Sequence, residues 1–236
     1  MINLIQDGNK RGVGLMKVLL LGATGRTGRL IMDTLLKDQY SVRILVREKS
    51  KVRRQSDRLE IMVGDTVSAS DLTEAAMGCG VIITALNISR NSDFPWSKLR
   101  TPVRFLSDTM LNILQTAALL NIDRVIVCSA WGVHETRKDV PWWFRWLIDH
   151  SNIGPAYADH ENQEKLLVSS NLNYTIIRPV ALTNLRTTAS LIVTKNNQPE
   201  PNLIISRKAV ARFIVSQLSD EQYYKSIVTI SQKSSY

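Results

Sequence analysis

A strand, a tight turn and a helix follow one another in one short stretch of this chain, KVLLLGATGRTGRLI at residues 17–31. The apolar run Val18–Leu21 has no polar alternation, which is typical of a strand buried on both faces of a parallel sheet. Beyond the turn, apolar residues recur at the spacing of one helix face, at Leu30, Ile31, Leu35 and Leu36. The stretch therefore predicts the first strand–helix unit of an α/β fold.

The turn carries glycines in the spacing G-x-x-G-x-x-G, at Gly22, Gly25 and Gly28. The first glycine permits the tight turn, and the second lets backbone N–H groups approach a pyrophosphate at the helix N-terminus. The third allows the helix to pack closely on the strand. Between a buried strand and a helix, this spacing predicts a dinucleotide-binding turn. The alternative is a plain tight turn in an unrelated α/β protein.

The alternation of strands and helices continues to the end of the chain. Further strands are expected at Val42–Val46, Leu59–Val63, Val81–Thr84, Val125–Cys128, Tyr174–Ile177 and Ile227–Ile230. Helices are expected after a capping pair of Asp71 and Glu74, after Thr101-Pro102, near residues 157–170, and after Ser206 as cap. The pattern predicts a doubly wound Rossmann fold, an α/β single domain with a mostly parallel sheet.

Composition limits the class of protein. The chain has 236 residues, of which 44% are hydrophobic and 22% charged, so extensive disorder and coiled coil are excluded. We expect residues 1–15 to form a flexible N-terminal tail and residues 16–236 to form an NAD(P)-binding domain, with a small substrate-side region at about 131–156 and 180–205. No apolar run is long enough for a membrane span or a signal peptide, and the two cysteines have no metal-ligand spacing. A cytoplasmic protein without a metal site is expected.

The chain is basic, with a formal net charge of +9. Such a charge favours anionic partners, which include nucleic acid, a membrane surface and a phosphorylated small molecule. Much of the excess lies in one segment, at Arg43, Arg47, Lys49, Lys51, Arg53, Arg54 and Arg58. No helix–turn–helix or RNA-binding signature accompanies it, so direct nucleic-acid binding ranks last.

This basic segment follows the second expected strand, where NAD sites usually place an acidic residue on the ribose. Here Arg47 stands at the end of the strand, and we expect it to bind the 2′-phosphate of NADP (NADPH), with Arg26 closing from the other side. Glu48 could face the ribose instead, and the remaining basic residues could form a solvated face.

Other cofactor contacts are expected where strands end at the carboxyl edge of the sheet. Asp65 can accept a hydrogen bond from the adenine amino group, although a Gly-Asp turn also explains it. Residues 84–87 would run under the nicotinamide ribose. The full expected set is Gly22, Thr24, Gly25, Arg26, Thr27, Gly28, Arg47, Asp65, Thr84, Ala85, Leu86, Asn87, Ser129 and Pro179.

From Lys17 to the final strand, the chain resembles the atypical short-chain dehydrogenase/reductases of the NmrA-like NAD(P)-binding family, nearest the flavin reductase/biliverdin-IXβ reductase type. The resemblance rests on Gly22-Ala-Thr-Gly25-Arg-Thr-Gly28, Leu45-Val-Arg47, Gly64-Asp65, Cys128-Ser-Ala130, Asp159-His160 and Ile177-Arg-Pro179. Members of this group reduce flavins, tetrapyrroles, quinones and dyes, and some only sense nicotinamide nucleotides. The resemblance therefore implies a cofactor more sharply than a substrate.

The expected catalytic residues are Ser129, His160 and Tyr157. The resemblance places Ser129 against the nicotinamide as a hydrogen-bond donor, although a strand-end cap would serve equally, and His160 could offer a proton near neutral pH. Ordinary short-chain reductases use a Tyr-x-x-x-Lys pair, whereas Tyr157 here is followed by Glu161. A carboxylate at that position would raise the tyrosine pKa, so ketone chemistry through Tyr157 is doubtful.

Three tryptophans gather in the stretch Pro141–Ile148. We weigh an aromatic lid over a planar acceptor, with Phe94–Trp96 as a facing wall, equally against simple packing, and an interfacial anchor with Arg145 comes third. The leading hypothesis is an NADPH-dependent oxidoreductase that transfers a hydride to a small-molecule planar acceptor. The alternative is a non-catalytic NADP-binding redox sensor with a protein partner.

Overall fold

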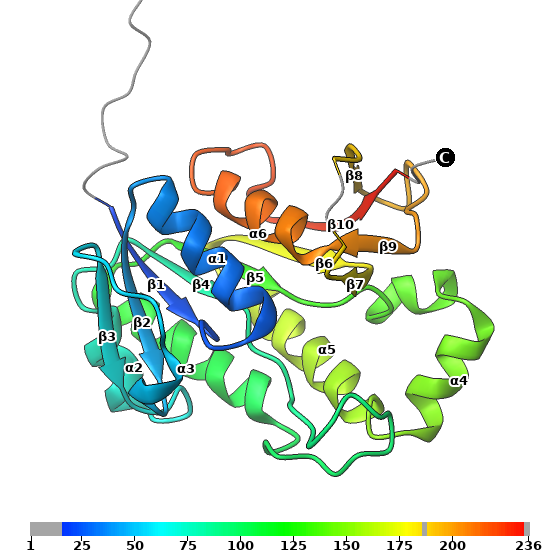
Figure 1. The fold of residues 1–236 in the computed structure, drawn as a ribbon, viewed down its shortest axis with the longest axis horizontal. Coiled ribbons are helices and arrows are strands. Elements are labelled where there is room, and N and C mark those ends of the chain that lie inside the picture. The colour runs from blue at the N-terminus through cyan, green and yellow to red at the C-terminus, as the bar shows by residue number, and fades with distance from the viewer. Residues whose placement is uncertain (1–15, 186–187, 234–236) are drawn as a thin grey trace, which may run out of the picture.

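An extended sheet runs through the centre of the molecule (Figure 1). The computed structural model describes residues 16–185 and 188–233, and within these ranges the main sheet has eight strands in the order β3-β2-β1-β4-β5-β6-β10-β8. The strands are parallel except β8, which runs antiparallel to β10. Their bounds are β1 Lys17–Leu21, β2 Ser41–Val46, β3 Leu59–Val63, β4 Val81–Thr84, β5 Arg124–Cys128, β6 Asn173–Pro179, β8 Leu191–Thr194 and β10 Ser226–Gln232.

The strand order reverses direction beside β1. The chain first adds β2 and β3 on one side of β1 and then returns to add β4 on the other side. At the carboxyl end of β1, Leu21 is paired with Leu45 of β2 and with Thr84 of β4. Open parallel sheets bind ligands at such a reversal, in the crevice outside the carboxyl ends of the strands.

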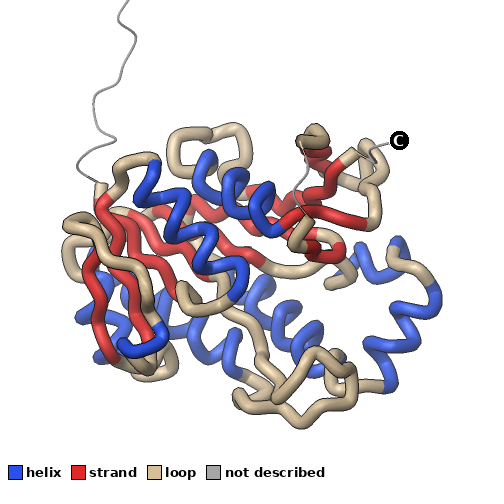
Figure 2. The backbone as a smooth tube through the Cα atoms, in the orientation of Figure 1, coloured by secondary structure: helices blue, strands red, loops and turns tan. Residues whose placement is uncertain are grey.

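Helices cover both faces of the sheet (Figure 2). Helices α1 (Arg26–Lys37) and α6 (Arg207–Ser216) pack side by side on one face, and α2 (Ala69–Ala76), α3 (Phe105–Leu120) and α5 (Gly154–Val168) cover the other. Each face has its own apolar cluster, because a strand buried on both faces contributes alternate side chains to each. Val18 and Leu20 belong to the first cluster, and Leu19 and Leu21 to the second. The predicted α/β Rossmann fold is confirmed.

Two helix starts differ from the prediction. Helix α2 is capped by Ser68, whose hydroxyl accepts a hydrogen bond from the backbone N–H of Asp71, so the predicted Asp71 cap is wrong. The Asp71 carboxylate instead accepts the Asp65 N–H at 2.9 Å. Helix α6 does begin after Ser206, whose hydroxyl accepts the Ala209 N–H as predicted.

The start of α3 was also predicted too early. The hydroxyl of Thr101 accepts the Ser89 N–H at 2.9 Å and does not cap the helix, which begins at Phe105. The free N–H groups of Leu106 and Ser107 donate to the buried carboxylate of Asp159 on α5, at 2.6 and 3.2 Å. A residue 53 positions away therefore supplies the cap.

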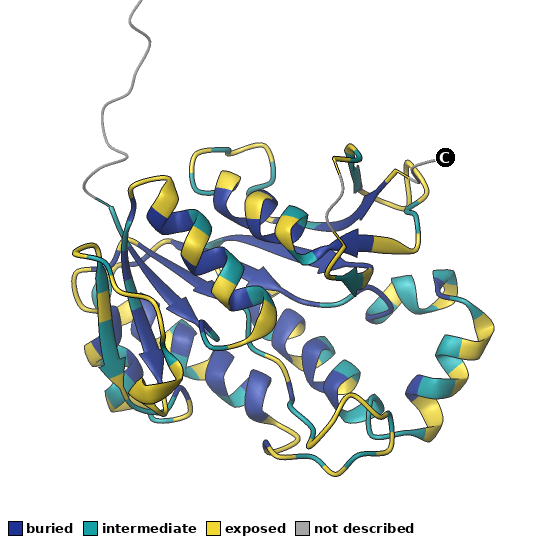
Figure 3. Cartoon of the chain, in the orientation of Figure 1, coloured by how far each residue is buried: buried dark blue, intermediate teal, exposed yellow. Residues whose placement is uncertain are grey.

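The expected substrate-side region contains elements that the sequence analysis left unassigned. Residues 131–156 hold a 3-10 helix η2 (His134–Asp139) and helix α4 (Trp142–His150), and a two-stranded sheet pairs β7 (Ala181–Thr183) with β9 (Ile204–Ser206). Helix α4 has one buried residue, Ile148, and Figure 3 shows it as largely exposed at the edge of the molecule. Its role as part of a substrate region stays a prediction. The predicted tail, residues 1–15, lies outside the described residues.

Candidate functional site

The glycine turn leaves no room for side chains at two of its three glycines. Gly22 has φ +87°, and a Cβ there would lie 2.6 Å from the carbonyl oxygen of Ala85, which follows β4. A Cβ on Gly28 would lie 2.0 Å from the carbonyl oxygen of Gly22, so α1 packs directly on the turn. The Gly25 N–H closes the turn by donating to the Gly22 carbonyl at 3.0 Å. These contacts supply the physical reasons for the glycine spacing.

The turn delivers the N-terminus of α1 to the reversal point of the sheet. Gly25 is the N-cap residue, and no side chain among the described residues caps this helix. The first N–H groups of α1 therefore remain available to an anion, and the helix dipole favours negative charge there. A tight glycine cradle and an uncapped helix N-terminus are the features that a dinucleotide pyrophosphate requires, so the residues present fit an NAD(P) cofactor.

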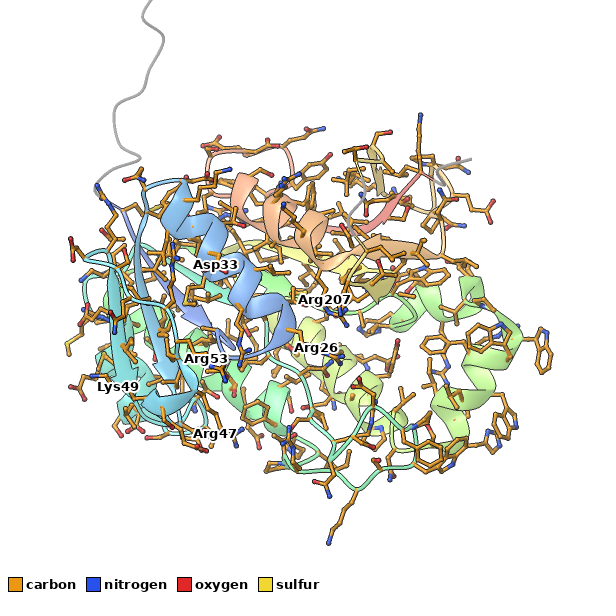
Figure 4. All side chains as sticks on the ribbon, viewed as in Figure 1. Arg26, Asp33, Arg47, Lys49, Arg53 and Arg207 are labelled. Atoms are coloured by element: carbon orange, nitrogen blue, oxygen red, sulfur yellow. The ribbon has the colours of Figure 1, made fainter. Side chains whose placement is uncertain are left out.

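Arg26 pairs with an acidic residue of the loop after β4. Its guanidinium makes a paired contact with the carboxylate of Asp93, at 2.8 and 2.9 Å. Figure 4 shows Arg26 on the side of the turn that faces Arg207, and burial together with the Arg26 charge lowers the pKa of Arg207. Asp93 is 67 residues away in sequence, and both side chains are largely exposed, so the pair is weak and the role of Arg26 at the 2′-phosphate stays a prediction.

A basic cavity adjoins the other side of the glycine turn. Its volume is about 290 Å³, and it is lined by residues of the turn, α1 and the segment after β2: Ala23, Thr24, Arg29, Met32, Asp33, Lys51, Val52, Arg53 and Arg54. Four of these residues are cationic, and Asp33 is the one acidic member, 3.7 Å from Arg54. Figure 4 shows Arg53 beside α1 and Arg47 further out. None of the four cationic residues, Arg29, Lys51, Arg53 and Arg54, is in the set of cofactor contacts expected from the sequence.

The two acidic residues considered for the adenosine end have partners within the chain. Glu48 accepts a hydrogen bond from Lys51 at 2.6 Å, and this bond with the Lys51 charge lowers the Glu48 pKa. One carboxylate oxygen of Asp65 accepts the Val67 N–H at 3.3 Å in a local turn. The Lys51 contact disfavours the alternative in which Glu48 faces the ribose. The local turn explains the hydrogen bond that the Asp65 carboxylate accepts from Val67.

The loops after β4, β5 and β6 meet beyond the turn. Thr84 is buried between β1 and β5, Asn87 is exposed, and Ala85 and Leu86 are partly buried between them. The pairing of β5 and β6 continues past Cys128, because Ser129 donates its N–H to Ile177 at 2.7 Å and Trp131 donates to Pro179 at 3.1 Å. Ser129 and Pro179 therefore lie on neighbouring strand ends at the carboxyl edge of the sheet.

Ser129 belongs to a buried charged network. Its hydroxyl donates to Glu164 of α5 at 2.5 Å, and Glu164 also pairs with Arg178 of β6 at 2.6 Å. Both Glu164 and Arg178 have side chains that are only 1% exposed. Arg178 further reaches Glu135 at 2.5 Å, and His134 lies 3.9 Å from Glu164. The sequence analysis missed Glu164, although Arg178 stood within the quoted Ile177-Arg-Pro179 motif.

The other two expected catalytic residues are neutral at physiological pH. Burial lowers the pKa of His160 to about 4, so His160 does not supply a proton near neutral pH, contrary to the expectation. Burial raises the pKa of Tyr157 to about 12, and Arg137 only partly offsets this. The Tyr157 pKa is raised, as expected, but the cause is burial and not Glu161. The Glu161 carboxylate accepts the His134 N–H.

The aromatic residues of α4 point in two directions. The ring of Phe144 meets Tyr157 edge-on at 6.0 Å, on the side toward α5. Trp142, Trp143 and Trp146 are exposed. Of α4, only the inner face, which carries Phe144, is in a position to form the predicted lid over an acceptor.

The described residues also bear on metal binding and membrane spanning. Their His, Cys, Asp and Glu side chains form no group of three that could hold a metal ion. Within the same ranges, no helix has the length and apolar character needed to cross a bilayer.

Comparison with known proteins agrees with this geometry. The family described as NAD(P)H-binding matches residues 22–221. An uncharacterized sugar epimerase, YhfK, of Bacillus subtilis is 27% identical over 210 residues, which cover 87% of this chain and 89% of the relative. An uncharacterized chloroplastic protein of Arabidopsis thaliana is 26% identical and covers 94% of this chain and 78% of the relative.

Solved structures share the fold. A short-chain dehydrogenase/reductase from Veillonella parvula in complex with NADP has a TM-score of 0.75 at 21% identity, covering 92% of this chain and 94% of the other. ChuY, an anaerobillin reductase from Escherichia coli O157:H7, has a TM-score of 0.76 at 18% identity, covering 94% and 99%. Because the family match spans residues 22–221, the chain belongs to the NAD(P)H-binding family.

Proposed function

We propose that the chain is a reductase that uses NADPH and passes a hydride to a planar acceptor of the flavin, quinone or tetrapyrrole kind. The observation that carries the proposal is the basic cavity next to Thr24, on the same side of the glycine turn as β2. A 2′-phosphate distinguishes NADPH from NADH, and Lys and Arg side chains around a cavity favour that dianion. Arg53, which lines the cavity, and Arg47, which follows β2 and lies outside the lining, are the residues proposed to select it.

The remaining contacts follow from the turn. The N-terminus of α1, at Gly25, Arg26 and Thr27, would hold the pyrophosphate through backbone N–H groups. The loop at Thr84–Asn87 and the strand ends at Ser129 and Pro179 would border the nicotinamide. When bound, NADPH supplies the hydride, and the protein's task is to orient the cofactor and the acceptor.

Ser129 is proposed to accept a hydrogen bond in this site rather than donate one. Its single hydroxyl proton is engaged by Glu164 at 2.5 Å, so only oxygen lone pairs are left for a ligand. A carboxamide NH₂ group is a suitable donor to that oxygen. This reverses the donor role that the sequence analysis gave to Ser129.

The choice of a planar acceptor rests on the two expected acids, Tyr157 and His160. Tyr157 with a pKa of about 12 and His160 with a pKa of about 4 are both poor proton donors at neutral pH. A ketone needs a positioned acid as the hydride arrives, whereas a flavin or quinone can take its proton from solvent. ChuY, of similar fold, is described as an anaerobillin reductase, which supports including a tetrapyrrole among the acceptors to be tested.

The same two pKa values favour a second candidate function, a sensor that binds NADP without turnover. A sensor must bind oxidised and reduced nucleotide with different affinities, and it needs no proton donor. Its readout would be a protein partner.

The test measures loss of NADPH absorbance with purified protein and a panel of FMN, a soluble quinone and a linear tetrapyrrole. Protein-dependent oxidation that falls with Ser129→Ala supports the reductase. Binding of NADPH without oxidation across the panel, together with a difference between NADPH and NADP⁺ affinities, would replace it with the sensor. Failure to bind either nucleotide would overturn both.

A further inference from the structure

Five exposed aromatic side chains lie on two segments that contact each other, and we call them the aromatic patch. Two come from the loop after β4 and three from α4. Their exposed fractions are 61% for Phe94, 43% for Trp96, 74% for Trp142, 55% for Trp143 and 50% for Trp146. Monomeric soluble proteins rarely expose contiguous apolar areas of this kind without a partner.

The patch is held together by specific contacts. The ring of Trp96 lies 5.3 Å from Phe94 and 6.3 Å from Trp146, and Trp146 stacks on His150 at 4.9 Å. The indole N–H of Trp96 donates to the His150 carbonyl at 2.7 Å, and the Asn152 side chain donates to the Trp96 carbonyl at 2.9 Å. Two segments far apart in sequence are thus joined while their ring faces stay exposed.

The patch lies on the outer face of α4. The inner face uses Phe144 against Tyr157 and buries Ile148 near Gly132. Trp142 and Trp146 are one helical turn apart on the other face. The core therefore takes Phe144 and Ile148, and Trp143 meets Phe144 edge-on at 5.6 Å, whereas Trp142 and Trp146 keep half or more of their surface exposed.

Cationic side chains accompany the patch. The loop that carries Phe94 and Trp96 is closed by a bridge between Arg90 and Leu99, next to the exposed Lys98 and Arg100. No ion pair among the described residues engages Lys98 or Arg100, whereas Asp93, the acidic residue of this loop, is held by Arg26. The same loop thus carries two exposed aromatic rings and two exposed cations that have no ion pair among the described residues.

We propose that the aromatic patch docks the protein on a lipid bilayer that contains anionic headgroups. Indole rings favour the membrane–water interface because they combine a large apolar surface with one polar group, and lysine and arginine add attraction to anionic lipid. A second copy of this chain fits less well, because a two-fold contact across the patch would bring Lys98 and Arg100 toward the same charges on the partner. The residues varied below, Trp142, Trp146, Lys98 and Arg100, are not among those proposed to bind the cofactor, so the docking proposal does not rest on the proposed reduction.

The experiment is co-sedimentation of the full chain with vesicles of phosphatidylcholine alone or of phosphatidylcholine with phosphatidylglycerol. We expect binding to the anionic vesicles, weakened by added salt. Trp142→Ser/Trp146→Ser removes apolar area, and Lys98→Glu/Arg100→Glu reverses the charge. Each pair is expected to lower partitioning by about tenfold or more.

Matched controls use exposed residues elsewhere. Leu119→Ser removes an apolar side chain that is 69% exposed on α3, and Lys37→Glu/Lys225→Glu reverses two exposed charges away from the patch. These controls should bind vesicles as the wild type does, and all variants should keep their NADPH affinity, which separates this proposal from the proposed function. The proposal fails if the wild type does not bind anionic vesicles, or if the tryptophan variant binds them equally. It also fails if the tryptophans instead support a concentration-dependent dimer.

Discussion

The hydroxyl of Ser129 donates a 2.5 Å hydrogen bond to the Glu164 carboxylate, and the same carboxylate pairs with Arg178. Glu164 lies on α5, Arg178 lies on β6, and Ser129 directly follows the neighbouring strand β5. The network therefore ties a helix to the carboxyl edge of the sheet where the nicotinamide is proposed to bind. It fixes which way the serine hydroxyl points before any ligand arrives.

Ser129→Ala should slow turnover by about tenfold and weaken NADPH binding by only about threefold, since it removes the one oxygen proposed to orient the carboxamide. It should also lower the free energy of unfolding by about 2 kcal/mol, because Glu164 loses a charge-assisted hydrogen bond. Steady-state kinetics and urea unfolding measure the two effects.

Ser107→Ala provides the matched control. Ser107 donates a 2.6 Å hydrogen bond to the buried carboxylate of Asp159, in the same chemistry but at the start of α3. Ser107→Ala should lower the free energy of unfolding by a similar amount and leave turnover unchanged. Equal kinetic losses in both variants would remove Ser129 from the proposed mechanism.

Arg47→Glu and Arg53→Glu should each weaken NADPH binding by about tenfold or more and NADH binding much less, because a like charge would face the 2′-phosphate. Titration followed by tryptophan fluorescence compares the two nucleotides. Lys37→Glu, an exposed reversal on α1, should affect neither. Equal losses for NADPH and NADH would contradict the assignment of the 2′-phosphate to this cavity.

Gly28→Ala should abolish cofactor binding and destabilise the domain by about 3 kcal/mol, because the new Cβ would meet the Gly22 carbonyl oxygen at 2.0 Å. Gly78→Ala tests whether replacing a glycine without steric overlap has the same effect. Gly78 has φ +74° but open space around it, so the cost there should be only about 1 kcal/mol and binding should persist. Thermal unfolding and NADPH titration of both variants check this. Wild-type affinity in Gly28→Ala would show that the turn relaxes.

The fold was predictable because its determinants are local. The buried strand before Gly22, the glycine spacing and the helical period after it lie within one short stretch, and the same alternation repeats along the chain. Contacts with distant residues were not predictable. Asp159 supplies the cap of α3, and Asp93 pairs with Arg26. Neither partner could be assigned from spacing, since each becomes a neighbour only after the sheet forms.

The site was predictable only in part for the same reason. The basic character of the segment after β2 was evident, but which of its side chains line the cavity with Thr24 depends on how that segment folds against α1. Glu164 looked like an ordinary helix residue, and its burial appears only when α5 packs beside Arg178. Short strands such as β7 and β9, of three residues each, give too little periodicity to detect.

His160 should make the protein less stable in acid. Its pKa falls from 6.5 in the unfolded chain to about 4 in the buried site, so the unfolded state binds the proton more tightly. The contribution of His160 to the free energy of unfolding is therefore fully present above pH 6.5. It is lost as the pH falls toward 4, by about 2 kcal/mol at pH 5. Urea unfolding at pH 7 and pH 5 should show this loss in the wild type and not in His160→Leu, where other titrating groups are the same. A parallel pH dependence in the two proteins would exclude His160 as its source.

Tyr157→Phe should leave turnover within about twofold of the wild type. Burial holds the Tyr157 pKa at about 12, so the phenol stays protonated and is a poor proton donor at neutral pH. The ring contact with Phe144 at 6.0 Å needs no hydroxyl, and the variant should fold as the wild type does. The rate of NADPH oxidation with the best acceptor of the panel, followed across neutral pH for both proteins, measures the effect. A loss of about a hundredfold, with unchanged NADPH affinity, would make Tyr157 the proton donor and restore ketone reduction as the chemistry of this site.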